Sequence, residues 1–235
     1  MPSELLFQSL NPLSLPDRVA KELKDALFSG RIKPGDAIVE RQVAQQMKVG
    51  TPVVREALIS LQAQGFVRRI ANTATRVTQF TDDEVRQLYR LRVELETTAL
   101  QWAKRRVTPA EIEELRTLVD ELVESGLEGD PRKFLERDLA FHSRYWELSG
   151  NPFLADTLKR LMAPLFVFAF FGTRKELTAP MAREHYELVD ALRDLDEPEF
   201  TDTVRRKLSG FATRWVSAIA GNGNAKDGVG GTHHP

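Results

Sequence analysis

The second half of the chain, residues 81–219, carries the pattern that most restricts its fold. Apolar residues recur there at helical spacing, and no strand pattern interrupts them. Two of the expected helices begin at capping boxes, Thr81-Asp82-Asp83-Glu84 and Thr108-Pro109-Ala110-Glu111. The pattern predicts an all-α antiparallel helical bundle with helices over residues 81–106, 108–125, 131–149, 151–172, 175–194 and 197–219.

The first part of the chain combines short helices with short strands. Helical patterns run from Pro16 to Gly30 and over residues 39–47 and 51–64, and strand patterns cover residues 66–70 and 75–79. Asn72, in the turn between the strands, is the residue there that best tolerates a positive φ. Three helices and a small β-hairpin describe a winged helix-turn-helix, so the whole chain is expected to be mainly α.

Four segments follow from these patterns. We expect an N-terminal arm over residues 1–15 and a winged helix-turn-helix domain over residues 16–79. A helical bundle is expected over residues 80–220. Residues 221–235 are rich in Gly and Asn, which predicts a disordered tail.

The two parts differ in charge. Residues 1–79 contain 11 Lys and Arg against 7 Asp and Glu, whereas the remaining residues contain 22 against 27. A basic front and an acidic rear indicate different partners, with nucleic acid for the front. The absence of Cys excludes disulfide scaffolds, thiolate zinc sites and a cysteine nucleophile. The longest apolar run, residues 165–171, is too short to span a membrane, and no signal peptide is recognisable, so we expect a cytoplasmic protein.

The helix-turn-helix pattern predicts which residues contact DNA. Its second helix enters the major groove with its N-terminal residues leading. Arg55 lies opposite the apolar stripe of that helix and can reach phosphate or guanine. Arg41 lies in the first turn of the preceding helix, and Arg68, Arg69 and Arg76 place three cations on the wing strands. The plainer alternative is that these arginines form only a solvated surface.

Four segments of the front part resemble the GntR family of bacterial transcription regulators. They read LFSGRIKPGD (27–36), ERQVA (40–44), VREAL (54–58) and LQAQGFV (61–67). The family usually has Ser-Arg before the recognition helix, where this chain has Gly50-Thr51, so one usual DNA-contacting arginine is missing. The resemblance implies that Arg41 and Arg55 contact double-stranded operator DNA, with Thr51, Arg68 and Arg69 as further candidates.

The rear part resembles the FCD ligand-binding domain of the FadR branch of this family. The segments that carry the resemblance read LYRLRVELE (88–96), DLAFH (138–142), SGNPFL (149–154) and EHYELVDAL (184–192). Together the two resemblances cover about residues 16–220. They imply a divalent metal (Zn, Ni or Mn) in the bundle core and a small carboxylate effector beside it.

Asp138 and His142 are four residues apart on one predicted helix, so their side chains share a face and can bind one ion. The resemblance adds His185 as a third ligand and places a fourth, a histidine, where this chain has Lys207. A protonated lysine has no lone pair to offer a metal. The departure at Lys207 therefore puts the metal in doubt.

Three interpretations of this cluster stay open. Asp138, His142 and His185 bind a metal with open positions, or Lys207 replaces the metal's charge and pairs with Asp138 or an effector carboxylate, or the histidines are ordinary core residues. Arg92 could hold an effector carboxylate by two hydrogen bonds, but we favour a surface ion pair with Glu96 one turn later. Of the four phenylalanines within residues 166–171, one or two are expected to line the pocket.

The sequence thus predicts a ligand-responsive DNA-binding transcription regulator that is not an enzyme. We expect a homodimer on a pseudo-palindromic operator, acting as a repressor released by a small organic acid. The alternative is a metal-dependent enzyme that uses Asp138, His142 and His185, because non-haem iron oxygenases use two histidines and one carboxylate.

Overall fold

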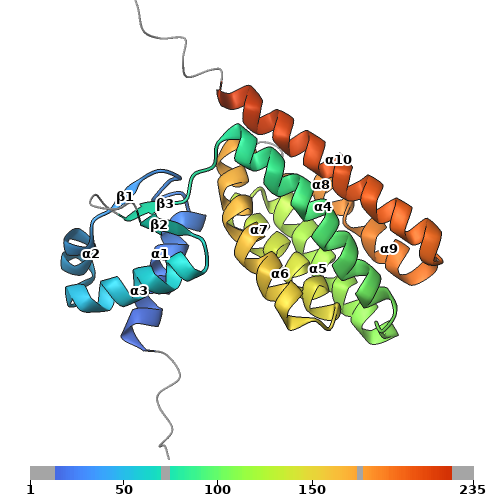
Figure 1. Cartoon of the computed structure of the whole chain (residues 1–235), viewed down its shortest axis with the longest axis horizontal. Coiled ribbons are helices and arrows are strands. Elements are labelled where there is room, and N and C mark those ends of the chain that lie inside the picture. Colours follow the sequence, from blue (N-terminus) through green and yellow to red (C-terminus); the bar gives the residue numbers. More distant parts are fainter. Residues whose placement is uncertain (1–13, 70–74, 174–176, 224–235) are drawn as a thin grey trace, which may run out of the picture.

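The computed structural model describes residues 14–69, 75–173 and 177–223. A small N-terminal unit of short helices and strands, which we call the head, lies beside a bundle of longer helices (Figure 1). The mainly α fold class expected from the sequence is confirmed. The predicted arm up to residue 13, the wing turn with Asn72 and residues 224–235 of the predicted tail lie outside the described residues.

The head contains three helices and three strands. They are α1 (Leu15–Phe28), β1 (Ala37–Ile38), α2 (Glu40–Met47), α3 (Thr51–Ala63), β2 (Val67–Arg69) and β3 (Thr75–Val77). The apolar stripe of α3 is buried and packs against α1. Lys48 ends α2 in the left-handed conformation, with φ of 54°, and turns the chain into α3. The helix-turn-helix is therefore built as expected.

The wing is a three-stranded antiparallel sheet in the order β1-β3-β2, not a two-stranded hairpin. The prediction missed β1, which has only two residues and pairs Ala37 with Arg76 and Ile38 with Thr75. Two residues are too few to show the alternation of apolar and polar side chains that predicts a strand, and β1 exists only through its pairing with β3.

The bundle contains seven helices within the described residues. They are α4 (Asp82–Lys104), α5 (Pro109–Glu128), α6 (Pro131–Leu148), α7 (Pro152–Thr173), α8 (Ala179–Arg183), α9 (Tyr186–Asp194) and α10 (Glu197–Gly223). Both predicted capping boxes are present at the starts of α4 and α5.

The single helix predicted over residues 175–194 is wrong. It is divided into α8 and α9 by a turn at Glu184 and His185. The backbone N–H of His185 donates to the carbonyl of Ala182, three residues back, at 3.1 Å, which tightens the chain there. The apolar pattern continues across this turn, so the sequence did not reveal it.

The head rests directly on the bundle, and buried apolar residues of both parts form one continuous core. Gly65 follows α3 with φ of +82°, and a Cβ there would lie 3.0 Å from both the Arg160 carbonyl oxygen and Pro164 Cγ of α7. Phe80 packs edge-on against Phe168 of α7, with ring centroids 5.4 Å apart. Helix α7 therefore contacts the head just after its recognition helix. No helix among the described residues is long and apolar enough to cross a membrane.

Candidate functional site

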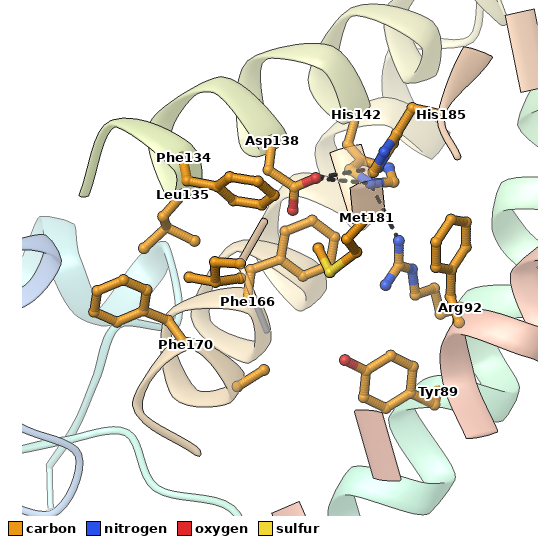
Figure 2. A pocket seen from close by; sticks show the side chains of 13 residues that line it. Tyr89, Arg92, Phe134, Leu135, Asp138, His142, Phe166, Phe170, Met181 and His185 are labelled. Atoms are coloured by element: carbon orange, nitrogen blue, oxygen red, sulfur yellow. Dashed lines mark hydrogen bonds and ion pairs between the residues drawn. The ribbon is translucent and has the colours of Figure 1, made fainter. Parts of the chain in front are cut away.

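A small cavity lies inside the bundle, with a polar end and an apolar wall (Figure 2). The space within it that the centre of a water molecule can occupy is about 30 Å³. The polar end is formed by Arg92 of α4, Asp138 and His142 of α6, and His185 at the turn between α8 and α9. Four of the five predicted effector residues therefore line one cavity.

Asp138, His142 and His185 converge as the sequence predicted. Asp138 Oδ1 lies 3.2 Å from His185 Nε2 and 3.7 Å from His142 Nε2. One candidate ligand atom from each residue lies within 4.8 Å of the others. The two residues of α6 share a face by their spacing, while only the turn after α8 brings His185 to them.

The hydrogen bonds of the two histidines indicate where their lone pairs lie. His185 Nδ1 is 3.0 Å from the Ala182 carbonyl, which can only accept, so Nδ1 carries a proton, and Nε2 is the ring nitrogen near Asp138. His142 Nε2 is 3.3 Å from Arg92 Nη2, which can only donate, so His142 Nδ1 donates to the Tyr145 hydroxyl at 2.9 Å. Both Nε2 atoms thus lie near Asp138 Oδ1.

The converging atoms of Asp138, His142 and His185 form a group that could hold a metal ion. Asp138 Oδ1 is buried and has no hydrogen-bond partner among the described residues. Burial lowers the pKa of His142 well below its ordinary value, and the charge of Arg92 and the neighbouring His185 lower it further. His142 is therefore neutral at pH 7 and available as a metal ligand.

Arg92 and Glu96 form an ion pair in the core, so the expectation of a surface pair is wrong. Arg92 Nε lies 3.1 Å from Glu96 Oε2, and both side chains are buried. Trp146 Nε1 donates to Glu96 Oε1 at 3.2 Å. Burial raises the pKa of Glu96, and the charge of Arg92 opposes this rise. The i, i+4 spacing correctly predicts the pair, but it cannot show that this face of α4 points inward.

Lys207 lies outside the cavity. Its ammonium pairs with Glu187 of α9, so the expected pairing with Asp138 is wrong. Phe211, one turn further along α10, lines the cavity instead and stacks on His185 with ring centroids 5.5 Å apart. A count of residues between two helices cannot fix which turn of the second helix meets the site.

The apolar wall was mostly missed by the sequence interpretation. Phe166 and Phe170 confirm the expectation that one or two of the α7 phenylalanines line the cavity. The other aromatic or aliphatic lining residues are Tyr89, Phe134, Leu135, Ala169, Leu177, Met181 and Phe211. Their helical spacing is that of any core residue, so no local signal distinguishes them.

The head presents the predicted DNA-contacting residues in different ways. Arg55 is 57% exposed at its side chain, and its Nε and Nη2 donate to Glu40 Oε2 at 3.2 and 3.0 Å. Thr51 is the first residue of α3. Arg41 is exposed on the first turn of α2. Glu40 thus ties the start of α2 to the recognition helix beside Arg41.

The two wing arginines have different surroundings. Arg68 pairs with Glu84 of α4 at 3.4 Å and lies over the Phe80 ring, 5.2 Å from its centroid. Arg69 is exposed and has no ion-pair partner among the residues described. Consecutive strand residues point to opposite faces, so only one of the two can face the bundle. Arg69 is the freer candidate for a phosphate contact.

Comparisons with known proteins match both parts of the chain. Residues 87–210 match the FCD domain, and residues 15–77 match the bacterial regulatory proteins of the gntR family. The HTH-type transcriptional regulator McbR of Escherichia coli (strain K12) is 26% identical over 192 residues, which cover 79% of this chain and 85% of that protein. The HTH-type transcriptional repressor NanR of Enterobacter sp. (strain 638) is 24% identical over 223 residues, covering 86% and 85%.

Solved structures show the same fold. E. coli McbR/YncC superposes with a TM-score of 0.74 at 23% identity, over 90% of this chain and all of the other. A putative GntR transcriptional regulator from Rhodococcus sp. RHA1 gives 0.72 at 21% identity, over 89% and 99%. The similarity therefore extends over the head and the bundle together.

Proposed function

Since the chain belongs to the GntR family of bacterial transcription regulators and carries an FCD domain, we propose a role for each of its two parts. The head binds operator DNA, and the bundle cavity holds a small carboxylate effector that changes this binding. The alternative of a metal-dependent enzyme is wrong, because both matched domains are those of transcription regulators. We keep residues 16–79 and 80–220 as the two domains, and place the protein in the cytoplasm, where its DNA lies.

Arg55 is the residue proposed to read the operator. Its side chain lies exposed on the recognition helix. Two of its guanidinium nitrogens, Nε and Nη2, donate hydrogen bonds to the Glu40 carboxylate. The remaining Nη1 atom is left to meet a phosphate or guanine. Arg41 and Arg69 supply phosphate contacts, which add affinity without sequence preference.

We propose a homodimer, because two-fold operators are read by two-fold proteins. Helix α4 carries Leu91 and Trp102, which are 42% and 37% exposed although both are large and apolar. They are three helical turns apart, with the partly buried Leu95 between them, so they lie on one side of α4. A second copy of the chain is the partner proposed for this face.

The donor set of the cavity suits one divalent metal, with Zn, Ni or Mn as candidates. Two imidazole nitrogens and one carboxylate are common ligands of these ions, and here all three present lone pairs. A bound metal would supply positive charge that attracts the effector's carboxylate. Arg92 Nη2 donates to His142 Nε2 in the metal-free cavity, so a metal bound there would free this guanidinium to meet the same carboxylate.

Helix α7 is proposed to carry the effector's influence to the head. Phe166 lines the cavity, while Pro164 and Phe168 of the same helix contact Gly65 and Phe80. A change in the packing around Phe166 is thus transmitted along α7 to the contacts that support the recognition helix. We propose a repressor released by its effector, as the curated relative NanR is named a repressor.

The observation that carries the proposal is one helix that contacts both the cavity with its polar end and the DNA-binding head. To test it, duplexes bound by the full chain are selected from a random-sequence pool and used in gel shifts. Arg55→Ala should abolish specific binding. Arg105→Ala is the matched control, because Arg105 is 68% exposed and paired with Glu197 of the bundle. Specific binding that survives Arg55→Ala would contradict the assigned role.

The effector arm of the proposal needs a separate measurement. A thermal-shift screen of small organic acids, with and without Zn, Ni or Mn, should find acids that raise the melting temperature. The same acids should weaken the gel shift of the selected duplex. Acids that stabilise the protein but leave DNA binding unchanged would refute the proposed coupling.

A further inference from the structure

We infer that the cavity selects a short monocarboxylate with an apolar body over hydroxy acids and dicarboxylates of equal size. The inference rests on the proposed effector role and specifies the chemical class of the effector. It follows from three features of the cavity: the position of its polar groups, the composition of its wall and its volume.

The polar groups of the cavity are gathered at one end. Arg92, Asp138, His142 and His185 lie together there, joined by the contacts drawn in Figure 2. The Tyr89 hydroxyl is the further polar group of the lining, and the Arg92 guanidinium carbon lies 5.7 Å from the centroid of the Tyr89 ring. A carboxylate at this end meets a cation. A second anionic group elsewhere in the cavity would meet no cation among the lining residues that the structure describes.

The rest of the wall is hydrocarbon, aromatic or thioether. It includes Phe134, Leu135, Phe166, Phe170, Leu177 and Met181. A ligand hydroxyl against this wall would give up its hydrogen bonds to water and find no partner, which weakens binding by about tenfold. A methyl group at the same place gains by leaving water. The wall therefore favours an alkyl body.

The volume limits the length of that body. The space that the centre of a water molecule can reach is small, about 30 Å³. This is the scale of a three- or four-carbon acid beside the polar end, and it is too small for a tricarboxylate. Propionate and butyrate are thus the simplest probes of the inferred class.

The test compares acids that differ at a single group. Butyrate, 3-hydroxypropionate and succinate present a methyl, a hydroxyl and a carboxylate at nearly the same distance from their first carboxylate. Calorimetric titration of the full chain, with and without Zn or Mn, should give a Kd for butyrate at least about tenfold below those of the other two. All three acids are then tested for their effect on the gel shift of the selected duplex.

The variant Met181→Gln places an amide in the apolar wall at a partly buried position. It should reduce the preference for butyrate over 3-hydroxypropionate by about tenfold. Leu118→Gln is the matched control, since Leu118 is partly buried on α5 and does not line the cavity. Melting curves of both variants show whether they are folded. Unchanged preference in folded Met181→Gln would overturn the role given to this wall.

The outcomes separate the two proposals. If 3-hydroxypropionate or succinate binds as tightly as butyrate and releases DNA, the inferred class is wrong and the effector role stands. If none of the acids in the wider organic-acid screen binds, with or without metal, the effector role and the class fall together. Binding of butyrate at least about tenfold tighter than the other two acids, with release of DNA, supports both.

Discussion

Replacing Asp138 by Asn should act in opposite directions on the metal-free and the metal-loaded protein. In the metal-free protein Asp138 Oδ1 is buried without a hydrogen-bond partner and faces His185 Nε2 at 3.2 Å. An Asn amide nitrogen at this place would donate to that lone pair. The substitution therefore replaces a contact between two acceptors with a hydrogen bond.

The size of the effect follows from the burial of the site. An unsatisfied buried acceptor costs about 1–3 kcal/mol, and the Asp138 side chain is 14% exposed, so about 1–2 kcal/mol is expected. For a chain of this size, that gain raises the Tm by about 2–8 °C in EDTA. A metal at 100 times its Kd stabilises the wild type by about 2.7 kcal/mol. If the variant binds the metal a hundredfold more weakly, the same metal concentration would stabilise it by under about 0.5 kcal/mol.

The assay is thermal denaturation at pH 7.5, first in EDTA and then with Zn, Ni or Mn. Asp156→Asn is the control, because Asp156 is exposed on α7 and is not one of the cavity residues. Its Tm should stay within about 2 °C of the wild type in both conditions. Elemental analysis of protein purified without chelator gives the metal content of each variant directly.

Two results would refute this reasoning. A lower Tm of Asp138→Asn in EDTA would mean that His185 carries a proton and forms an ion pair with Asp138 in place of a metal. Equal stabilisation of variant and wild type by metal would mean that Asp138 is not a ligand.

Three further predictions concern stability in acid, the contact between the head and the bundle, and the DNA contacts of the head. The pKa of His142 is lower in the folded than in the unfolded chain, so the unfolded chain binds a proton first as the pH falls. The free energy of unfolding should therefore drop below about pH 6.5, by up to about 1.4 kcal/mol per pH unit. Urea denaturation of His142→Asn should show a shallower drop. Gly65→Ala should lower the free energy of unfolding by about 1–3 kcal/mol in the same assay, since its φ is +82° and the new Cβ meets Pro164. Unchanged stability would show that the contact between Gly65 and α7 adapts to the methyl group. Arg41→Ala and Arg69→Ala should weaken binding to all duplexes alike and reduce the salt slope by about one each; a change in base preference would contradict phosphate contact.

The sequence alone determined most helices and the type of fold. Capping boxes at Thr81 and Thr108 and continuous apolar periodicity predict α4 and α5, because these signals act between residues three or four apart. The same local rule places Asp138 and His142 on one face of α6. The GntR-like segments around Arg55 likewise predict the helix-turn-helix, since its turn and helix starts are local features.

The tertiary structure decided what those elements enclose. Only packing reveals that Arg92 and Glu96 are buried, that Phe211 and not Lys207 reaches the cavity, and that β1 exists through its pairing with β3. The turn at His185 likewise interrupts an apolar pattern that continues through it. Local spacing fixes neighbours along one helix, whereas burial and the meeting of groups from different helices depend on how whole surfaces fit together.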